Sequence, residues 1–98
     1  MPSVADLVDP NALAAIADAR AYSVGTAWAD RGSVRLDDVE PQRVTAELAG
    51  DDGPHRVQLT SGPQGLRWWC DCDPGGPMCT HVVATAVETW RRSHLSQA

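Results

Sequence analysis

The chain has 98 residues, of which 13 are acidic and 8 basic, so its formal net charge is −5 and its isoelectric point lies near 4.9. This acidic total disfavours nucleic-acid binding, because a domain that neutralises several phosphates usually carries a basic face. No apolar run approaches the length of a membrane span and no export signal opens the chain, so we expect no membrane anchor.

The length predicts a single domain over residues 9–92, with residues 1–8 flexible and residues 93–98 a tail. All basic residues are arginine, a bias typical of GC-rich bacterial genomes. The 3 cysteines are an odd number, which fits poorly with a disulfide framework and better with thiols in a reducing compartment. We therefore expect a cytoplasmic protein.

Two helices are predicted near the start of the domain. The first covers residues 10–17, with Asp9 at the N-cap and a proline at the first helical position. Asp18 is expected to cap the second, which ends at Gly32, where glycine suits the left-handed conformation after a helix. Gly25 inside this helix costs about 1 kcal/mol relative to alanine, which indicates that a close neighbour packs against it.

The middle of the chain predicts an antiparallel sheet of three to four strands. Strands are expected over residues 33–39, 43–49, 55–60 and 66–69. In the second and third, apolar and polar residues alternate across a turn sequence at residues 50–54, so these strands form a hairpin. The residues expected to face the core are Val44, Ala46, Leu48, Val57 and Leu59.

Four potential metal ligands follow the last strand, within residues 70–81. Cys70 and Cys72 are separated by one residue, so both can face one metal from the end of a strand. Cys79 is expected in the lead-in to a helix, Thr80 at its N-cap and His81 in its first turn. Three thiolates and one imidazole complete a tetrahedral zinc site. The sequence therefore predicts one structural Zn2+ with ligands Cys70, Cys72, Cys79 and His81.

The arrangement of these segments predicts an α+β fold. N-terminal helices precede the small sheet, and a tight turn at residues 73–77 returns the chain to the zinc site. Apolar residues at helical spacing after His81 predict a C-terminal helix that packs on the sheet. Four protein ligands leave no open position on the metal, so we expect neither enzymatic activity nor a small-molecule substrate.

The motif resembles the SWIM zinc-finger family, whose signature is Cys-x-Cys, a variable gap, and Cys-x-His running into a helix. The likeness extends over about residues 18–90, although Thr80 stands where the family often has lysine and Trp69 where a smaller residue is usual. The resemblance implies a module that binds protein or nucleic acid, and a Swi/Snf-type helicase as its partner. The residues that are similar to the family's lead segment are Tyr22, Gly25, Trp28, Gly32 and Val34.

Five side chains are candidate contacts for a partner or a nucleic acid. Trp68 and Trp69 are adjacent in a strand, so one is expected in the core and the other at the surface. Arg67, Arg91 and Arg92 can contact phosphate, although arginines at the end of a helix are also expected from its dipole.

The charge makes a protein–protein adaptor the leading hypothesis. A nucleic-acid-binding zinc finger is the alternative, and a zinc–thiolate redox switch is a third hypothesis. His55 and His94 lack partners at ligand spacing and are interpreted as surface histidines. Asp71 and Asp73 are interpreted as solvated loop residues. The remaining aromatic residues, expected in the core, are Tyr22, Trp28 and Trp90.

Overall fold

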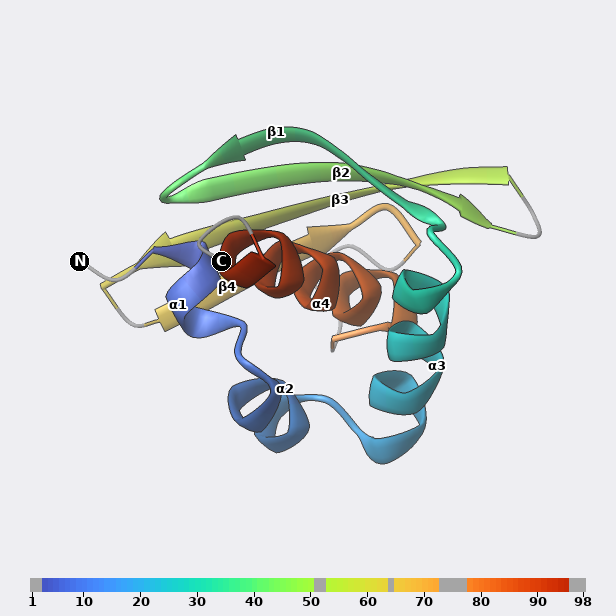
Figure 1. Cartoon of the computed structure of the whole chain (residues 1–98), viewed down its shortest axis with the longest axis horizontal. Helices are drawn as coiled ribbons and strands as arrows, with labels where there is room; N and C mark the ends of the chain where they lie inside the picture. The colour runs from blue at the N-terminus through green and yellow to red at the C-terminus, as the bar shows by residue number, and fades with distance from the viewer. Residues whose placement is uncertain (1–2, 51–52, 64, 73–77, 96–98) are drawn as a thin grey trace.

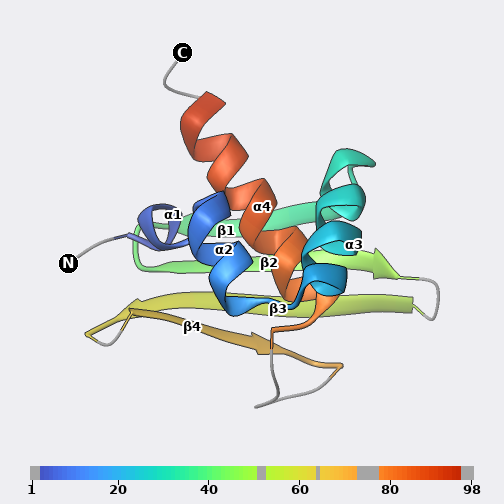
Figure 2. The same cartoon turned by 90° about the horizontal axis from the view of Figure 1, so that it is seen from below.

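A four-stranded antiparallel sheet carries a layer of helices on one face (Figure 1, Figure 2). A computed structural model describes residues 3–50, 53–63, 65–72 and 78–95. The strands, which lie side by side in chain order, are β1 (Val34–Glu40), β2 (Arg43–Gly50), β3 (Gly53–Gly62) and β4 (Gly65–Cys70). The helices are α1 (Val4–Leu7), α2 (Pro10–Ile16), α3 (Ala19–Asp30) and α4 (Thr80–Leu95). The expected α+β class is confirmed.

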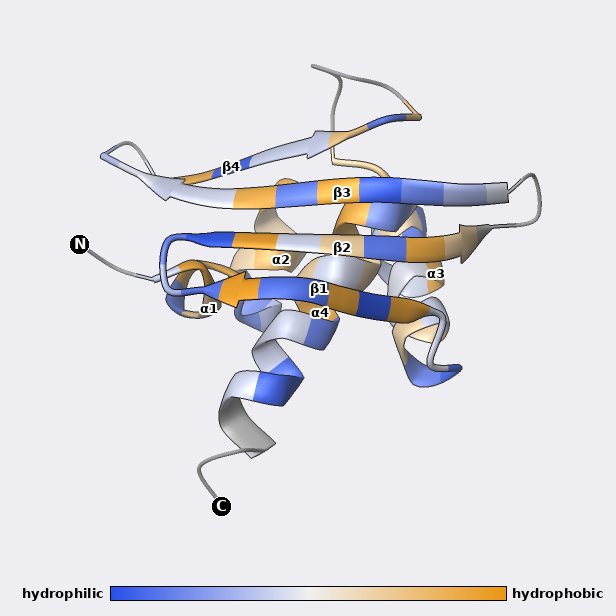
Figure 3. Cartoon of the chain, turned by 90° about the horizontal axis from the view of Figure 1, so that it is seen from above, coloured by the Kyte–Doolittle hydropathy of each residue, from blue (hydrophilic) through white to orange (hydrophobic). Residues whose placement is uncertain are grey.

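The apolar alternation of β2 and β3 determines which face of the sheet the helices cover. Val44 pairs with Leu59 and Ala46 with Val57, and all four side chains are buried. The intervening residues face the uncovered side, which Figure 3 shows in front of the helices. The predicted hairpin is therefore present, with Gly50 paired to Gly53, while residues 51 and 52 of the expected turn lie outside the described residues.

Both ends of α3 form as the sequence predicts. The carboxylate of Asp18 accepts a hydrogen bond from the first turn of the helix at 2.7 Å. Gly32 follows the helix with φ of 72°. Its N–H donates to the carbonyl of Ala29 at 3.1 Å, and the N–H of Ser33 donates to that of Trp28 at 3.2 Å. These paired bonds satisfy the last carbonyls of the helix and require the left-handed residue between them.

Helix α4 lies at the centre of the fold, between the sheet and α3. Residues 82–87 are consecutive and all buried, so this part of the helix is enclosed on all sides, and its side chains are small or β-branched. At Gly25 the two helices approach so closely that an added Cβ would lie 2.6 Å from Cγ1 of Val83 and 3.0 Å from the backbone nitrogen of Ala84. The expectation of a close neighbour at Gly25 is confirmed. The buried residues of α4 are Val82, Val83, Ala84, Thr85, Ala86, Val87 and Thr89.

Residues 3–8, which were expected to be flexible, form α1 and its flanks. Ser3 and Asp6 bond reciprocally at the start of this helix, at 3.1 and 3.3 Å, and Val4 and Val8 are fully buried. A helix of 4 residues is too short to show an apolar period, so periodicity could not predict it. Residues 1 and 2 lie outside the described residues.

Helix α4 also continues to Leu95, past the point where the tail was expected to begin. Asp9 stands at the N-cap of α2 as predicted, but its side chain makes no capping hydrogen bond. None of the described helices is long and apolar enough to cross a membrane.

Substitution Gly25→Ala is expected to destabilise the fold by about 1–3 kcal/mol, because the new methyl group must displace Val83 or separate the two helices. Chemical denaturation of the variant measures this free energy. Helix propensity alone predicts a gain of about 1 kcal/mol, so the sign of the change distinguishes the two effects. The control Ser23→Ala, at an exposed position of the same helix, should change stability by no more than about 0.5 kcal/mol.

Candidate metal centre

The four predicted ligands meet where β4 ends and α4 begins, and their donor atoms all lie within 4.8 Å of one another. Cys70 is the last residue of β4, and Cys72 follows in the turn beyond it. Cys79 directly precedes α4, and His81 is the second residue of that helix. The group could therefore bind one metal ion.

The distances within the group match the edges of a small tetrahedron. The Sγ atom of Cys72 lies 3.4 Å from that of Cys70 and 3.6 Å from that of Cys79. Nδ1 of His81 lies 3.4 Å from Sγ of Cys72, 3.6 Å from Cys70 and 3.8 Å from Cys79. Bond lengths of about 2.3 Å to sulfur and 2.0 Å to nitrogen give tetrahedral edges of about 3.8 and 3.5 Å. These five distances, with all donor atoms within 4.8 Å of one another, are compatible with a four-coordinate ion.

The start of α4 differs by one residue from the prediction. The first helical hydrogen bond runs from the N–H of Val83 to the carbonyl of Cys79, at 3.0 Å, so Cys79 holds the N-cap position and Thr80 is the first helical residue. Threonine was expected at the N-cap because of its side-chain preference, but the N-cap residue here is the one that faces the other ligands. The positive end of the helix dipole therefore lies at Cys79.

The three thiols differ in their exposure. Cys70 is buried, Cys79 is half-buried and Cys72 is exposed. Burial raises the pKa of the Cys70 thiol well above its usual range, because the thiolate would lose its hydration there. A divalent ion would compensate this cost, although three thiolates leave the complete site with one net negative charge.

His55 lies against the cluster, so its interpretation as an ordinary surface histidine is wrong. Its Nδ1–H donates to Oδ1 of Asp71 at 3.0 Å, and its side chain is only 13% exposed. Its ring stacks on the ring of His81 with centroids 4.1 Å apart and planes at 25°. Ligand spacing could not reveal this contact, but strand register could: β3 and β4 pair Val57 with Cys70, and this register continued brings residue 55 beside residue 72.

Asp71 is also more than a solvated loop residue, although its side chain is 40% exposed. Its backbone N–H donates to the carbonyl of Arg56 at 3.2 Å, and its Oδ2 accepts from the N–H of Arg56 at 3.2 Å. The hydrogen bond from His55 lowers the pKa of the Asp71 carboxyl. These two hydrogen bonds to Arg56 continue the β3–β4 pairing by one residue beyond Cys70. Asp71, which makes them, lies between the ligands Cys70 and Cys72. Asp73 and the expected turn over residues 73–77 lie outside the described residues.

The two adjacent tryptophans separate as strand geometry predicts. Trp68 is half-buried and packs against the core, whereas Trp69 is 40% exposed on the uncovered face of the sheet. Arg67 is exposed and lies on the same face as Trp69, two residues earlier in β4. Of the other aromatic residues, Tyr22, Trp28 and Trp90 pack against the core but are only partly buried.

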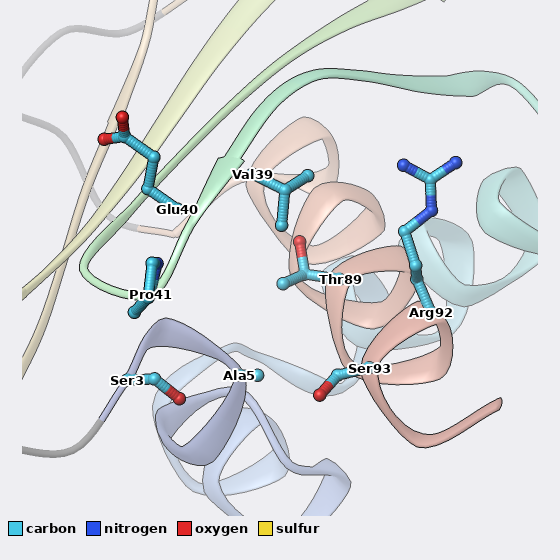
Figure 4. A pocket seen from close by; sticks show the side chains of 8 residues that line it. All are labelled: Ser3, Ala5, Val39, Glu40, Pro41, Thr89, Arg92 and Ser93. Atoms are coloured by element: carbon cyan, nitrogen blue, oxygen red, sulfur yellow. The ribbon is translucent and has the colours of Figure 1, made fainter. Parts of the chain in front are cut away.

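The other two candidate arginines lie on the helix layer, away from Arg67. Arg91 forms an ion pair with Asp30 of α3. Arg92 lines a cavity of about 520 Å³ between α1, the end of β1 and α4, together with Val39 and Thr89 (Figure 4). The structure therefore does not bring the three arginines together into one phosphate-binding face.

Comparison of the chain with protein-family models, with curated proteins and with solved structures finds no match. The resemblance to the SWIM family therefore stays a prediction that depends on the Cys-x-Cys and Cys-x-His motif.

Metal affinity at this site is expected to fall as the pH falls from about 8 to about 6, because each bound sulfur must lose its proton. The raised pKa of Cys70 keeps that thiol protonated through neutral pH in the metal-free protein, so a metal ion must displace its proton. Competition titrations with a chromophoric chelator at several pH values, corrected for the chelator's own protonation, measure the slope. An affinity independent of pH would contradict thiolate ligation.

Proposed function

We propose that this chain is a zinc-stabilised, non-enzymatic interaction module whose partner is another protein. The observation that supports the proposal most directly is the closed set of three sulfur atoms and one imidazole nitrogen at tetrahedral spacing. Soft thiolate ligands in a four-coordinate arrangement favour Zn2+ over the hard cations Mg2+ and Ca2+, which prefer oxygen. A reducing compartment such as the cytoplasm would keep these thiols available for the metal.

A structural role follows from where the four ligands lie in the chain. Two come from the end of β4 and two from the start of α4, so a bound ion would join the edge of the sheet to the central helix. The zinc ion would supply four bonds that oppose separation of these elements. A chain of this size buries a limited core, so this cross-link is expected to contribute a large part of its stability.

The surroundings of the cluster support a non-enzymatic role. Four protein ligands occupy the whole coordination shell, so no position is open for water or substrate. The cavity of Figure 4 is lined by residues at α1, at the end of β1 and the turn after it, and in the second half of α4, and no metal ligand is among them. This cavity therefore lies apart from the metal-binding group.

The charges on the uncovered face of the sheet favour a protein partner over nucleic acid. Arg43 lies 3.6 Å from Asp38 and 3.3 Å from Glu40, and Arg56 lies 3.9 Å from Glu47. These arginines are already opposed by carboxylates, so the face has little net positive charge for phosphates. Mixed charges around an exposed tryptophan are typical of protein interfaces. By family resemblance, the partner that we propose is a Swi/Snf-type helicase.

One observation favours nucleic acid as a second candidate. Arg67 makes no ion pair within the described residues, and it lies beside the exposed ring of Trp69 on the same strand face. An aromatic ring with a neighbouring cation is the minimal arrangement that stacks a base and contacts its phosphate. Arg67 and Trp69 are therefore the part of the uncovered face that a single-stranded nucleic acid would contact.

The unsubstituted protein purified from zinc-supplemented cells should contain one equivalent of zinc per chain, measured by elemental analysis. Substitution Cys70→Ser or Cys79→Ser should lower this ratio strongly and reduce thermal stability, because a site with three remaining ligands binds zinc much less tightly. A chelator should have the same effect on the unsubstituted protein. The control Asp37→Asn removes an exposed carboxylate outside the cluster and should retain full zinc content. Full zinc content in both cysteine variants would contradict the assignment.

Zinc-loaded protein is expected to show no salt-sensitive binding to labelled single- or double-stranded DNA in fluorescence anisotropy, since Arg43 and Arg56 on the sheet face are paired with acids and Arg67 alone offers too little positive charge. Zinc-dependent binding that weakens steeply with salt and is lost in Arg67→Ala would instead establish the nucleic-acid function. The matched variant Arg91→Ala removes one arginine from the helix layer. DNA binding that is lost in Arg67→Ala but retained in Arg91→Ala would depend on the sheet face and not on the total charge.

A further inference from the structure

His81 is the ligand whose orientation the protein must control most closely. Each cysteine offers a single sulfur donor, whereas imidazole has two nitrogens on a flat ring, and only one rotation of that ring directs Nδ1 at the metal. The described structure has Nδ1 of His81 between 3.4 and 3.8 Å from all three sulfur atoms. Contacts on the faces and edges of the ring must therefore select this rotation.

Two aromatic rings contact the imidazole of His81. His55 stacks on it with centroids 4.1 Å apart and an interplanar angle of 25°. Trp28 of α3 meets it at 61°, with centroids 5.1 Å apart. The two rings come from β3 and from α3, so the His81 imidazole is contacted by both layers of the fold. A rotation about its side-chain bonds would break the stacked contact with His55.

His55 is itself held in place. Its Nδ1–H donates to Asp71 at 3.0 Å, and the carboxylate of Asp71 is fixed by a second hydrogen bond from the backbone N–H of Arg56. Asp71 lies between the ligands Cys70 and Cys72, so its carboxylate moves with that part of the site. The orientation of His55 is therefore tied both to β3 and to the segment that carries two of the thiolates.

We propose that His55, oriented by Asp71, is a positioning residue that holds the His81 imidazole with Nδ1 facing the thiolates and thereby sets the metal affinity of the site. The inference rests on the proposed zinc-binding function and deepens it. Metal-ligating histidines are usually oriented by a carboxylate or carbonyl that bonds their second ring nitrogen. Here a carboxylate acts through an intervening imidazole, which transmits the constraint by stacking.

The hydrogen bond to Asp71 fixes one edge of the His55 ring but does not determine what its faces contact. The observed side chain is 13% exposed and lies nearly parallel to a ligand ring, an arrangement that the Asp71 hydrogen bond alone does not require. The ring of His55 and its Nδ1 donor therefore have separable roles, and two substitutions can separate them. His55→Asn retains a donor near Asp71 and removes the ring, whereas His55→Phe retains a ring and removes the donor.

The test uses the full chain loaded with Co2+, a spectroscopic substitute for zinc, and measures the dissociation constant by chelator competition. His55→Ala and His55→Asn are expected to weaken binding by about 10–100-fold, the range found for residues that orient metal ligands. His55→Phe should recover part of this loss because the stack is retained. Asp71→Asn should give a smaller loss in the same direction, and it provides a second variant if His55→Ala fails to fold.

The Co2+ absorption bands give a readout that a general loss of stability would not change. Variants with a misoriented imidazole should show shifted d–d bands and faster exchange of the metal at saturating Co2+. The matched control Arg56→Ala removes an exposed side chain of β3 but keeps the backbone N–H that bonds Asp71. It should retain the affinity and the spectrum of the unsubstituted protein.

Affinity within about twofold of the unsubstituted protein in both His55→Ala and His55→Asn would overturn the inference while leaving the zinc proposal intact. Losses as large in Arg56→Ala as in His55→Ala would also overturn it, because the effect would then not depend on the stacked ring. Absence of metal binding in the unsubstituted protein would overturn both proposals.

Discussion

The convergence of three sulfur atoms and one imidazole between β4 and α4 is the arrangement on which the rest of the structure depends. β4 is the last strand of the sheet and α4 is its central covering helix, and the two come together at their ligand-bearing ends. The spacing of the donor atoms suits a tetrahedral ion. A metal ion bound there would restrict both elements at once, which a small apolar core does only weakly.

The central position of α4 places strict limits on its neighbours. Its buried side chains are small or β-branched, and this lets α3 cross it at the distance that Gly25 permits. The same helix presents His81 to the ligand cluster less than one turn before the crossing. The packing of α3 against α4 and the orientation of Trp28 beside His81 are therefore parts of one arrangement. A change in the helix crossing would also move a ring that contacts a ligand.

The two faces of the sheet have different physical characters. The covered face supplies the apolar core, while the uncovered face carries paired charges and one exposed tryptophan. An exposed Trp69 on an otherwise polar face is the feature that most clearly suggests contact with another molecule. The acidic total charge of the chain and the ion pairs of Arg43 and Arg56 favour a protein over a nucleic acid as that molecule, since neither leaves a strongly positive surface.

The sequence by itself determined the elements whose signals are local. Apolar alternation gave the β2–β3 hairpin, Asp18 and Gly32 gave the ends of α3, and the ligand spacing identified the four residues that the structure brings together. It did not reveal α1, because 4 residues are too few to show a helical period. It also did not reveal the role of His55 or Asp71, and it could not place Arg67 apart from Arg91 and Arg92. Only the tertiary structure decided these, because strand register and helix packing bring together residues that are distant in the chain and that no regular sequence interval relates.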